Sequence, residues 1–202
     1  MKPKVIKISR DGVSGNTYIV TADNRTGVVI DPSEPGTWDE VMRRGIVCPY
    51  VLLTHGHFDH VGGCREFNEN GANIICSERE KGFIFSPENL GIFGGVDIPL
   101  FMVSRTLRDG EQFNLCGINF TAIATPGHTA GSMCYLSYDN LFTGDTLFKE
   151  SVGRTDLPTG SQRDLYYSLK KLSALEGDYK IYAGHGANST LSHEREYNPF
   201  IH

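Results

Sequence analysis

The stretch Val51-Leu52-Leu53-Thr54-His55-Gly56-His57-Phe58-Asp59-His60 joins an apolar run to three histidines and one aspartate. The apolar residues predict a buried strand over residues 50–53, which delivers the polar residues at its carboxyl end. Imidazole nitrogen and carboxylate oxygen are the usual ligands of catalytic transition metals, and they bind at neutral pH with little need for a shifted pKa. This stretch therefore predicts a metal centre directly after a strand.

The spacing within this stretch divides the four ligand candidates into two pairs. His55 and His57 are two residues apart, so their side chains point the same way where extended backbone leaves the strand. Asp59 and His60 fall where a helix is expected to begin, which turns them toward a different spot nearby.

The same order, an apolar run followed by Thr or Gly and then a ligand-type residue, occurs at three further places. These runs lead to His128, Asp145 and His185. If the strands end at one edge of the fold, seven such residues meet there, by analogy with the sites of layered α/β proteins. Seven ligands are too many for one tetrahedral ion and suit two ions that share a carboxylate. We assign His55, His57 and His128 to one ion, Asp59, His60 and His185 to the other, and Asp145 to the bridging position.

We expect the centre to hold two divalent cations. Zinc is the metal expected, and iron or manganese is also compatible with these ligands. Two ions about 3.5 to 4 Å apart clamp a hydroxide and take up the charge of an oxyanion, with Asp59 and Asp145 as the catalytic carboxylates beside it. A purely structural zinc site favours four closed ligands that include cysteine. None of the five cysteines has a matching position; they are Cys48, Cys64, Cys76, Cys116 and Cys134.

Strand-like and helix-like runs alternate along the whole chain. Strands are expected over residues 4–8, 16–22, 27–30, 50–53, 72–76, 112–115, 118–124, 132–137, 140–142 and 180–183. Helices are expected over residues 36–44, 60–70 and 163–175, with a helical turn after Ser192. Strands that lead into helices, twice over, predict an α/β fold of two packed sheets with helices outside, as one domain over residues 1–202.

Composition and charge exclude several partners. The 202 residues carry a net charge of -5 with scattered basic residues, which argues against nucleic-acid binding. No apolar stretch approaches membrane-spanning length, and the N-terminus lacks the apolar core of a signal peptide.

An odd number of cysteines without a C-x-x-C pair predicts reduced thiols, so we expect a cytoplasmic protein. The oligomeric state is open.

Four motifs carry a resemblance to a known family. They read Thr54-His55-Gly56-His57-Phe58-Asp59-His60-Val61-Gly62-Gly63, Thr125-Pro126-Gly127-His128-Thr129-Ala130-Gly131-Ser132, Phe142-Thr143-Gly144-Asp145-Thr146-Leu147-Phe148 and Ala183-Gly184-His185-Gly186. Together they resemble the signature of the metallo-β-lactamase superfamily, and within it the short glyoxalase II (hydroxyacylglutathione hydrolase) branch. The resemblance implies an αββα four-layer sandwich, with two mixed sheets face to face and the two-metal site along one edge. It also implies that hydroxide attacks a small-molecule thioester such as S-D-lactoylglutathione and that a thiolate leaves.

Two departures from that branch concern the substrate. Full-length glyoxalase II enzymes carry a C-terminal helical domain that helps bind glutathione, whereas this chain stops soon after His185, so no such domain is expected. The Gly-Lys-aromatic segment of those enzymes corresponds here to Gly153-Arg154-Thr155-Asp156. Arg154 either holds a substrate carboxylate through a bidentate pair or forms an internal salt bridge with Asp156. Glutathione as the thiol is therefore left open.

Other activities fit the same ligand types. The segment around Arg154 also resembles persulfide dioxygenases, which bind one iron through two histidines and an aspartate; here these would be His57 or His55, with His128 and Asp145. A β-lactamase is disfavoured because none of the cysteines follows a suitable strand end. Another hydrolase of the superfamily and a non-catalytic metal-binding protein are the remaining alternatives. Residues 81–95 either form a hydrophobic lip over the substrate or pack into the core; their apolar residues are Phe83, Ile84, Phe85, Ile92 and Phe93.

Overall fold

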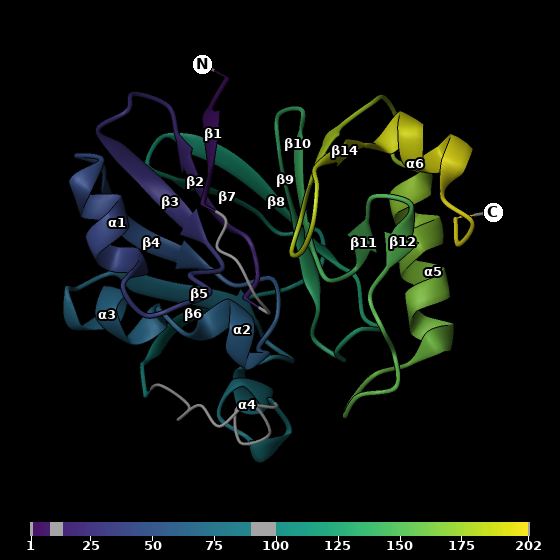
Figure 1. The fold of residues 1–202 in the computed structure, drawn as a ribbon, viewed down its shortest axis with the longest axis horizontal. Coiled ribbons are helices and arrows are strands. Elements are labelled where there is room, and N and C mark those ends of the chain that lie inside the picture. Colours follow the sequence, from purple (N-terminus) through teal and green to yellow (C-terminus); the bar gives the residue numbers. More distant parts are fainter. Residues whose placement is uncertain (1, 9–13, 90–99, 202) are drawn as a thin grey trace.

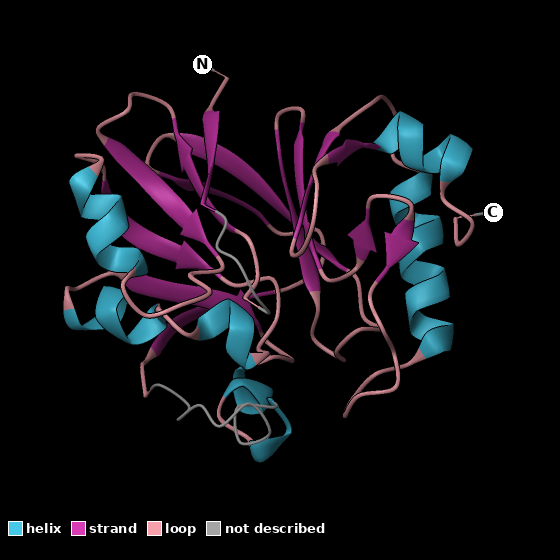
Figure 2. Ribbon diagram, viewed as in Figure 1, coloured by secondary structure: helices cyan, strands magenta, loops and turns pink. Residues whose placement is uncertain are grey.

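Two six-stranded mixed sheets pack face to face, and helices cover the outer face of each sheet (Figures 1 and 2). This computed structural model describes residues 2–8, 14–89 and 100–201. Helices α1 and α3 lie on the first sheet, at the left of the view, and α5 and α6 lie on the second, at the right. The expected αββα sandwich is confirmed.

The first sheet has the order β1-β2-β3-β4-β5-β6. Its strands are Lys4–Ile8, Thr17–Thr21, Thr26–Ile30, Val47–Leu52, Asn73–Ser77 and Val103–Leu107. The first three strands form an antiparallel meander, whereas β3, β4, β5 and β6 run parallel to one another. The parallel strands all end at the same edge, so the loop after β4 opens there.

The second sheet has the order β14-β13-β10-β9-β8-β7. In sequence order its strands are β7 (Gln112–Leu115), β8 (Ile118–Ala124), β9 (Met133–Ser137), β10 (Asn140–Gly144), β13 (Lys180–Ala183) and β14 (Ser189–Thr190). Strands β10 and β13 are parallel, and the remaining neighbours are antiparallel. A two-stranded ribbon, β11 (Leu147–Phe148) and β12 (Ser151–Val152), follows β10.

The helices are short, apart from one. They are α1 (Thr37–Arg43), α2 (Phe58–Val61), α3 (Cys64–Glu69), α4 (Lys81–Ile84), the 3-10 turn η1 (Pro87–Asn89), α5 (Gln162–Ser173) and α6 (Leu191–Tyr197). In α5 the Ser161 side chain caps the N-terminus by accepting from the Asp164 amide. Its buried residues include Leu165, Leu169 and Leu172, the helical spacing that the sequence shows. No helix in the described ranges has both the length and the apolar character that crossing a membrane requires.

Three apolar clusters hold these layers together. The central cluster lies between the sheets and includes Tyr18, Phe120, Tyr135 and Phe142, each at most 2% exposed. The other two clusters lie under the helices of each outer face. Because β2 is buried on both sides, its five residues do not alternate between buried and exposed, and its centre is the apolar run Tyr18-Ile19-Val20.

The structure differs from the expected elements in two respects: one expected helix is divided, and several strands were not expected. The helix expected over residues 60–70 is two helices, α2 and α3, that meet at Gly62 and Gly63. A Cβ at Gly62 would lie 2.5 Å from the Ser33 carbonyl oxygen, and one at Gly63 2.6 Å from that of Glu34, so these glycines let the chain contact the neighbouring loop closely. Strands β6, β11, β12 and β14 were not expected, because the last three are only two residues long and β6 follows a segment without a clear period.

Candidate metal centre

The seven ligand-type residues lie at the edge of the sandwich where β4, β8, β10 and β13 end. Five of the seven are histidines. Short distances between their side chains connect the ends of strands from both sheets. The structure therefore brings together every residue that the sequence assigned to the metal centre.

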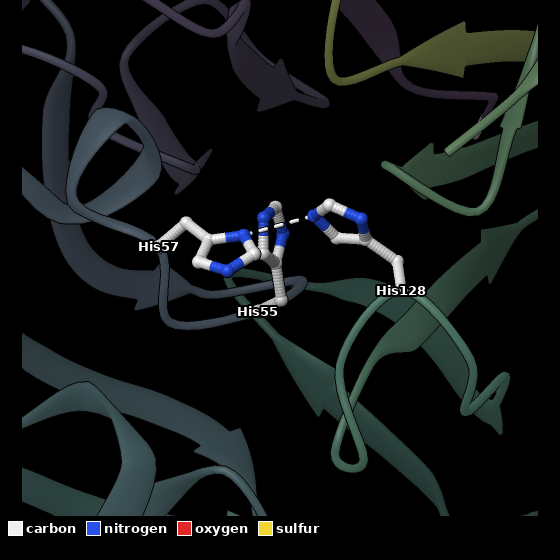
Figure 3. Close-up of side chains that lie close together, drawn as sticks. All are labelled: His55, His57 and His128. Atoms are coloured by element: carbon white, nitrogen blue, oxygen red, sulfur yellow. Dashed lines mark hydrogen bonds between the residues drawn. The ribbon is translucent and has the colours of Figure 1, made fainter. Parts of the chain in front are cut away.

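His55, His57 and His128 form the first group. Each offers a ring nitrogen within 4.8 Å of the others, and all three are buried. Figure 3 shows the three rings turned toward one another, with 2.8 Å between His57 Nδ1 and His128 Nε2. Nitrogens bound to one tetrahedral zinc lie roughly 3.4 Å apart, since each Zn–N bond is about 2.0–2.1 Å. The His57–His128 distance is shorter than this value, and the ligand atoms of the group all lie within 4.8 Å of one another.

Asp59, His60 and His185 form the second group, with ligand atoms again within 4.8 Å of one another. His60 Nε2 lies 3.2 Å from His185 Nε2, and His185 Nε2 lies 3.2 Å from Asp59 Oδ2. His60 is fully buried, whereas His185 is one-third exposed. This group is therefore the one that solvent reaches more easily.

Asp145 lies between the two groups. Its Oδ2 is 3.5 Å from His128 Nε2 and 3.5 Å from His185 Nε2, and its Oδ1 is 3.4 Å from His60 Nε2. Burial raises the pKa of this carboxyl, but the positive charges of the surrounding histidines outweigh burial and hold the pKa well below its usual range. Asp145 is therefore an ionised carboxylate in reach of both groups.

Two glycines make room for this carboxylate. A Cβ on Gly184 would lie 2.1 Å from Asp145 Oδ1, and one on Gly153 would lie 1.8 Å from the Asp145 carbonyl oxygen. No real Cβ approaches so closely, so any side chain at either position has to displace Asp145.

Asp31 is a part of the site that the sequence analysis missed. Its Oδ1 accepts from the Thr54 amide at 2.8 Å, and its Oδ2 accepts from the Thr54 hydroxyl at 2.6 Å and lies 3.0 Å from His60 Nδ1. Its backbone is left-handed, with φ of 49°. Asp31 directly follows strand β3, without the Thr or Gly that precedes the other ligands, so only a wider search for an aspartate after any apolar run could have found it.

The second nitrogen of three histidines has a hydrogen-bond partner. His55 Nδ1 is 3.1 Å from the Thr54 hydroxyl, His60 Nδ1 contacts Asp31, and His128 Nδ1 lies 2.8 Å from the Arg154 carbonyl oxygen. A donor at Nδ1 leaves the lone pair of Nε2 available, which is how outer partners orient metal-binding histidines.

Several buried polar atoms of the site are suited to binding a cation. Four buried side-chain nitrogen or oxygen atoms of the described residues have no hydrogen-bond partner, and three belong to this cluster: His55 Nε2, His57 Nε2 and Asp145 Oδ1. A buried polar atom without a partner is costly, so His55 Nε2 and Asp145 Oδ1 indicate a ligand, whereas His57 faces the first group through Nδ1. Neutral nitrogen and ionised oxygen are suitable donors for zinc, iron or manganese, so the residues present fit a pair of divalent cations.

The two groups differ in charge when no cation is bound. Burial and the neighbouring imidazoles lower the pKa of His55 well below its usual range and that of His57 to about 3. Burial also lowers the pKa of His60 and His185, but the carboxylates of Asp145 and Asp59 outweigh it and raise these pKa values to about 9 and about 10. His55 and His57 are therefore neutral at pH 7, and the second group pairs imidazolium with carboxylate.

The Arg154 side chain is exposed and pairs with another residue of its own segment. Its guanidinium forms an exposed bidentate pair with Asp156, with N–O distances of 2.7 and 2.6 Å, which is the internal salt bridge considered above. Only its carbonyl oxygen reaches the site, through His128. Binding of a substrate carboxylate by Arg154 stays a prediction, and it requires this pair to open.

Part of the segment considered as a lip packs into the protein. Phe83 and Ile84 are buried, and the Phe83 ring lies 5.4 Å from that of His57. Phe85 is 37% exposed and contacts Phe101. Ile92 and Phe93 lie outside the described residues. Phe83 therefore forms an apolar wall beside the first ligand group.

The fold and the ligand cluster define a metallohydrolase, and the comparisons with known proteins give its family. The metallo-β-lactamase superfamily profile matches residues 10–185. The chain is 34% identical over 197 residues to the hydroxyacylglutathione hydrolase GloC of Haemophilus influenzae, covering 92% of each chain. This chain belongs to the metallo-β-lactamase superfamily.

Solved structures agree with this assignment. A crystal structure of the BLEG-1 B3 metallo-β-lactamase superimposes with a TM-score of 0.89 at 26% identity, over 98% of this chain and 99% of the other. The di-iron-bound form of TTHA1623 superimposes with a TM-score of 0.84 at 30% identity, over 96% and 99% of the two chains.

Proposed function

We propose that this metallohydrolase uses two divalent cations to cleave a small-molecule thioester, with S-D-lactoylglutathione as the test substrate. The observation that carries the proposal is the position of Asp145, whose carboxylate lies about equally far from a histidine of each ligand group. A shared carboxylate suits two ions held close together, which is an arrangement for hydrolysis more than for structural zinc.

The ligand assignment follows the two groups. His55, His57 and His128 would hold one ion, and Asp59, His60 and His185 the other, with Asp145 shared between them. When bound, such a cation pair supplies a water of lowered pKa and neutralises oxyanion charge.

The chain's own residues prepare the site for that role. The Asp31 and Arg154 oxygens fix the orientation of His60 and His128 by hydrogen bonding. The Phe83 ring and the buried first group keep bulk water from one side. Asp59, which contacts the partly exposed His185, and Asp145 are the carboxylates available to orient a proton on the open side of the site.

The choice of a thioester rests on the relative. GloC of Haemophilus influenzae is named a hydroxyacylglutathione hydrolase, and both chains are covered almost entirely by the match. Arg154 is the candidate contact for a carboxylate of the thiol portion, and it would have to exchange Asp156 for that carboxylate. A cytoplasmic location accords with five free cysteines. We propose zinc as the bound metal, and the di-iron-bound form of TTHA1623 supports iron as the alternative.

Metal analysis with parallel assays tests this proposal. We expect two ions per chain and hydrolysis of S-D-lactoylglutathione that is lost after chelation and restored by adding metal. Replacing Asp145 by Asn should lower this activity by at least about 10²-fold while the protein stays folded. Two bound ions with no thioester cleavage would remove the substrate assignment, and a chain that binds no metal would remove the whole proposal.

The second candidate is an iron-dependent persulfide dioxygenase. The sequence Gly153-Arg154-Thr155-Asp156 favours it, since this segment resembles those enzymes. It requires a single iron and oxygen consumption with glutathione persulfide, so an oxygen electrode separates it from the hydrolase. A β-lactam should be assayed alongside, because a B3 metallo-β-lactamase shares the fold closely.

A further inference from the structure

Glu80 is a buried carboxylate that the proposed chemistry does not use. It is 1% exposed and lies in the turn before α4, in a segment that supplies none of the seven ligand-type residues. An ionisable side chain this deeply buried is uncommon unless its oxygens are bound by donors. The identity of its donors is therefore informative.

The two oxygens of Glu80 contact two different ligand-bearing loops. Oε1 accepts from the Gly56 amide at 2.8 Å, and Gly56 lies between His55 and His57. Oε2 accepts from the Thr129 hydroxyl at 3.1 Å, and the Gly131 amide also donates to this carboxylate. Thr129 directly follows His128 in the sequence. One carboxylate thus connects the backbone on both sides of the first ligand group.

The second loop is shaped to fit this carboxylate. A Cβ on Gly131 would lie 2.2 Å from Glu80 Oε2 and 2.6 Å from the Glu80 amide nitrogen. Only glycine allows the loop after His128 to approach Glu80 this closely. The close contact accords with the hydrogen bond from the Gly131 amide and indicates a specific fit.

These loops belong to different sheets. Gly56 follows β4 of the first sheet, and Thr129 lies between β8 and β9 of the second. The distance of 2.8 Å between His57 Nδ1 and His128 Nε2 therefore depends on how the two sheets are held at this edge. Within the described residues, the hydrogen bonds of the Glu80 carboxylate go to the first group's loops, whereas His60 of the second group is held by Asp31.

We propose that Glu80 is a positioning residue that sets the spacing between the His55–His57 loop and the His128 loop, and so determines the metal affinity of the first group alone. This inference rests on the proposed metal centre. Outer-shell contacts of this kind commonly change metal affinity by 10–100-fold.

The variant Glu80→Gln tests the inference with little change of shape. The amide keeps one oxygen acceptor but turns an NH₂ group toward donors that need an acceptor, so the two loops lose part of their connection. The matched control is Glu78→Gln, two residues earlier, where the carboxylate is exposed and pairs only with Arg108 among the partners described for it.

The measurement is zinc affinity at pH 8, by competition with a chromophoric chelator, in two backgrounds. In His185→Ala only the first group can bind, and we expect Glu80→Gln to weaken zinc about 10-fold or more. In His128→Ala only the second group is complete, and we expect Glu80→Gln to change its affinity less than about 3-fold. Glu78→Gln should alter neither.

The other outcomes contradict either the role of Glu80 or the proposed metal centre. Equal weakening in both backgrounds, or none in either, overturns the role of Glu80 in positioning the first group. If the unaltered chain binds no zinc, the proposed metal centre fails instead, which is a separate result. Should Glu80→Gln not fold by circular dichroism, Thr129→Val, which removes one of the three donors, decides by the same comparison, with a smaller loss expected in His185→Ala only.

Discussion

Asp31 and His60 lie 29 residues apart in the sequence, yet Asp31 Oδ2 is 3.0 Å from His60 Nδ1. The same oxygen accepts the Thr54 hydroxyl, which in turn lies 3.1 Å from His55 Nδ1. The Asp31 carboxylate therefore orients one histidine of each ligand group. In both rings the lone pair on Nε2 stays available to bind a metal.

The variant Asp31→Asn tests this arrangement. An amide NH₂ facing His60 Nδ1 favours the ring form with its proton on Nε2, which takes away the lone pair that would bind metal. We expect zinc affinity to fall about 10–100-fold, measured by chelator competition. Asp39→Asn, at an exposed position of α1, is the control. Unchanged affinity in Asp31→Asn would show that the hydrogen bond does not govern the ring.

A single methyl group at Gly184 should disable the site. A Cβ there would lie 2.1 Å from Asp145 Oδ1 and 2.8 Å from His60 Cε1, so Asp145 has to move. A displacement of about 1 Å in a catalytic group costs on the order of 10²-fold in rate, and we expect that loss in kcat/KM for Gly184→Ala.

The matched control for Gly184→Ala is Gly82→Ala. Gly82 is exposed in α4 and a Cβ there meets nothing within 4 Å, so activity should be unchanged. Full activity of Gly184→Ala would contradict the placement of Asp145.

The stability of the metal-free protein should depend on Glu80 between pH 4.5 and 7. Burial raises the pKa of this carboxyl from 4.5 to about 7, outweighing the donors Gly56, Thr129 and Gly131, which lower it. In this range the folded state binds the proton more tightly than the unfolded chain, so the free energy of unfolding falls as the pH rises. Relative to Glu80→Gln, the unaltered chain should lose roughly 3 kcal/mol across this range.

Urea unfolding at pH 5, 6 and 7.5 checks this expectation. Other titrating groups, such as His60 and His185, are common to both proteins and cancel in the difference. Parallel pH profiles of the two proteins would rule out a raised pKa at Glu80.

Removal of metal should lower thermal stability. Ions present at 100 times their dissociation constant stabilise the folded state by about 2.7 kcal/mol. For a chain of this length that corresponds to a drop in Tm of roughly 5–10 °C on chelation. Scanning calorimetry with and without chelator measures it, and re-addition of zinc should restore the midpoint. If chelation leaves the Tm unchanged, the cluster binds no metal that stabilises the folded state.

Long apolar runs made most of the fold predictable. The strands expected at residues 118–124 and 180–183 coincide with β8 and β13, and the leucine spacing located α5. The continuous helix expected over residues 60–70 was wrong, because the contacts of Gly62 and Gly63 with the loop at Ser33 and Glu34 are tertiary. The one-domain assignment stays a prediction.

The sequence by itself determined which residue types reach the edge of the sandwich, because a strand places the residue after its end at that edge. This is why all seven ligand candidates were found by their position after apolar runs. Only the tertiary structure decided how they are held. The contacts of Glu80 with Gly56 and Thr129, and of Asp31 with His60, span 24 to 49 residues of sequence. No local period encodes such contacts. The Gly56 and His60 contacts form when strands β3, β4 and β5 of the first sheet pair, and the Thr129 contact forms when the two sheets pack together.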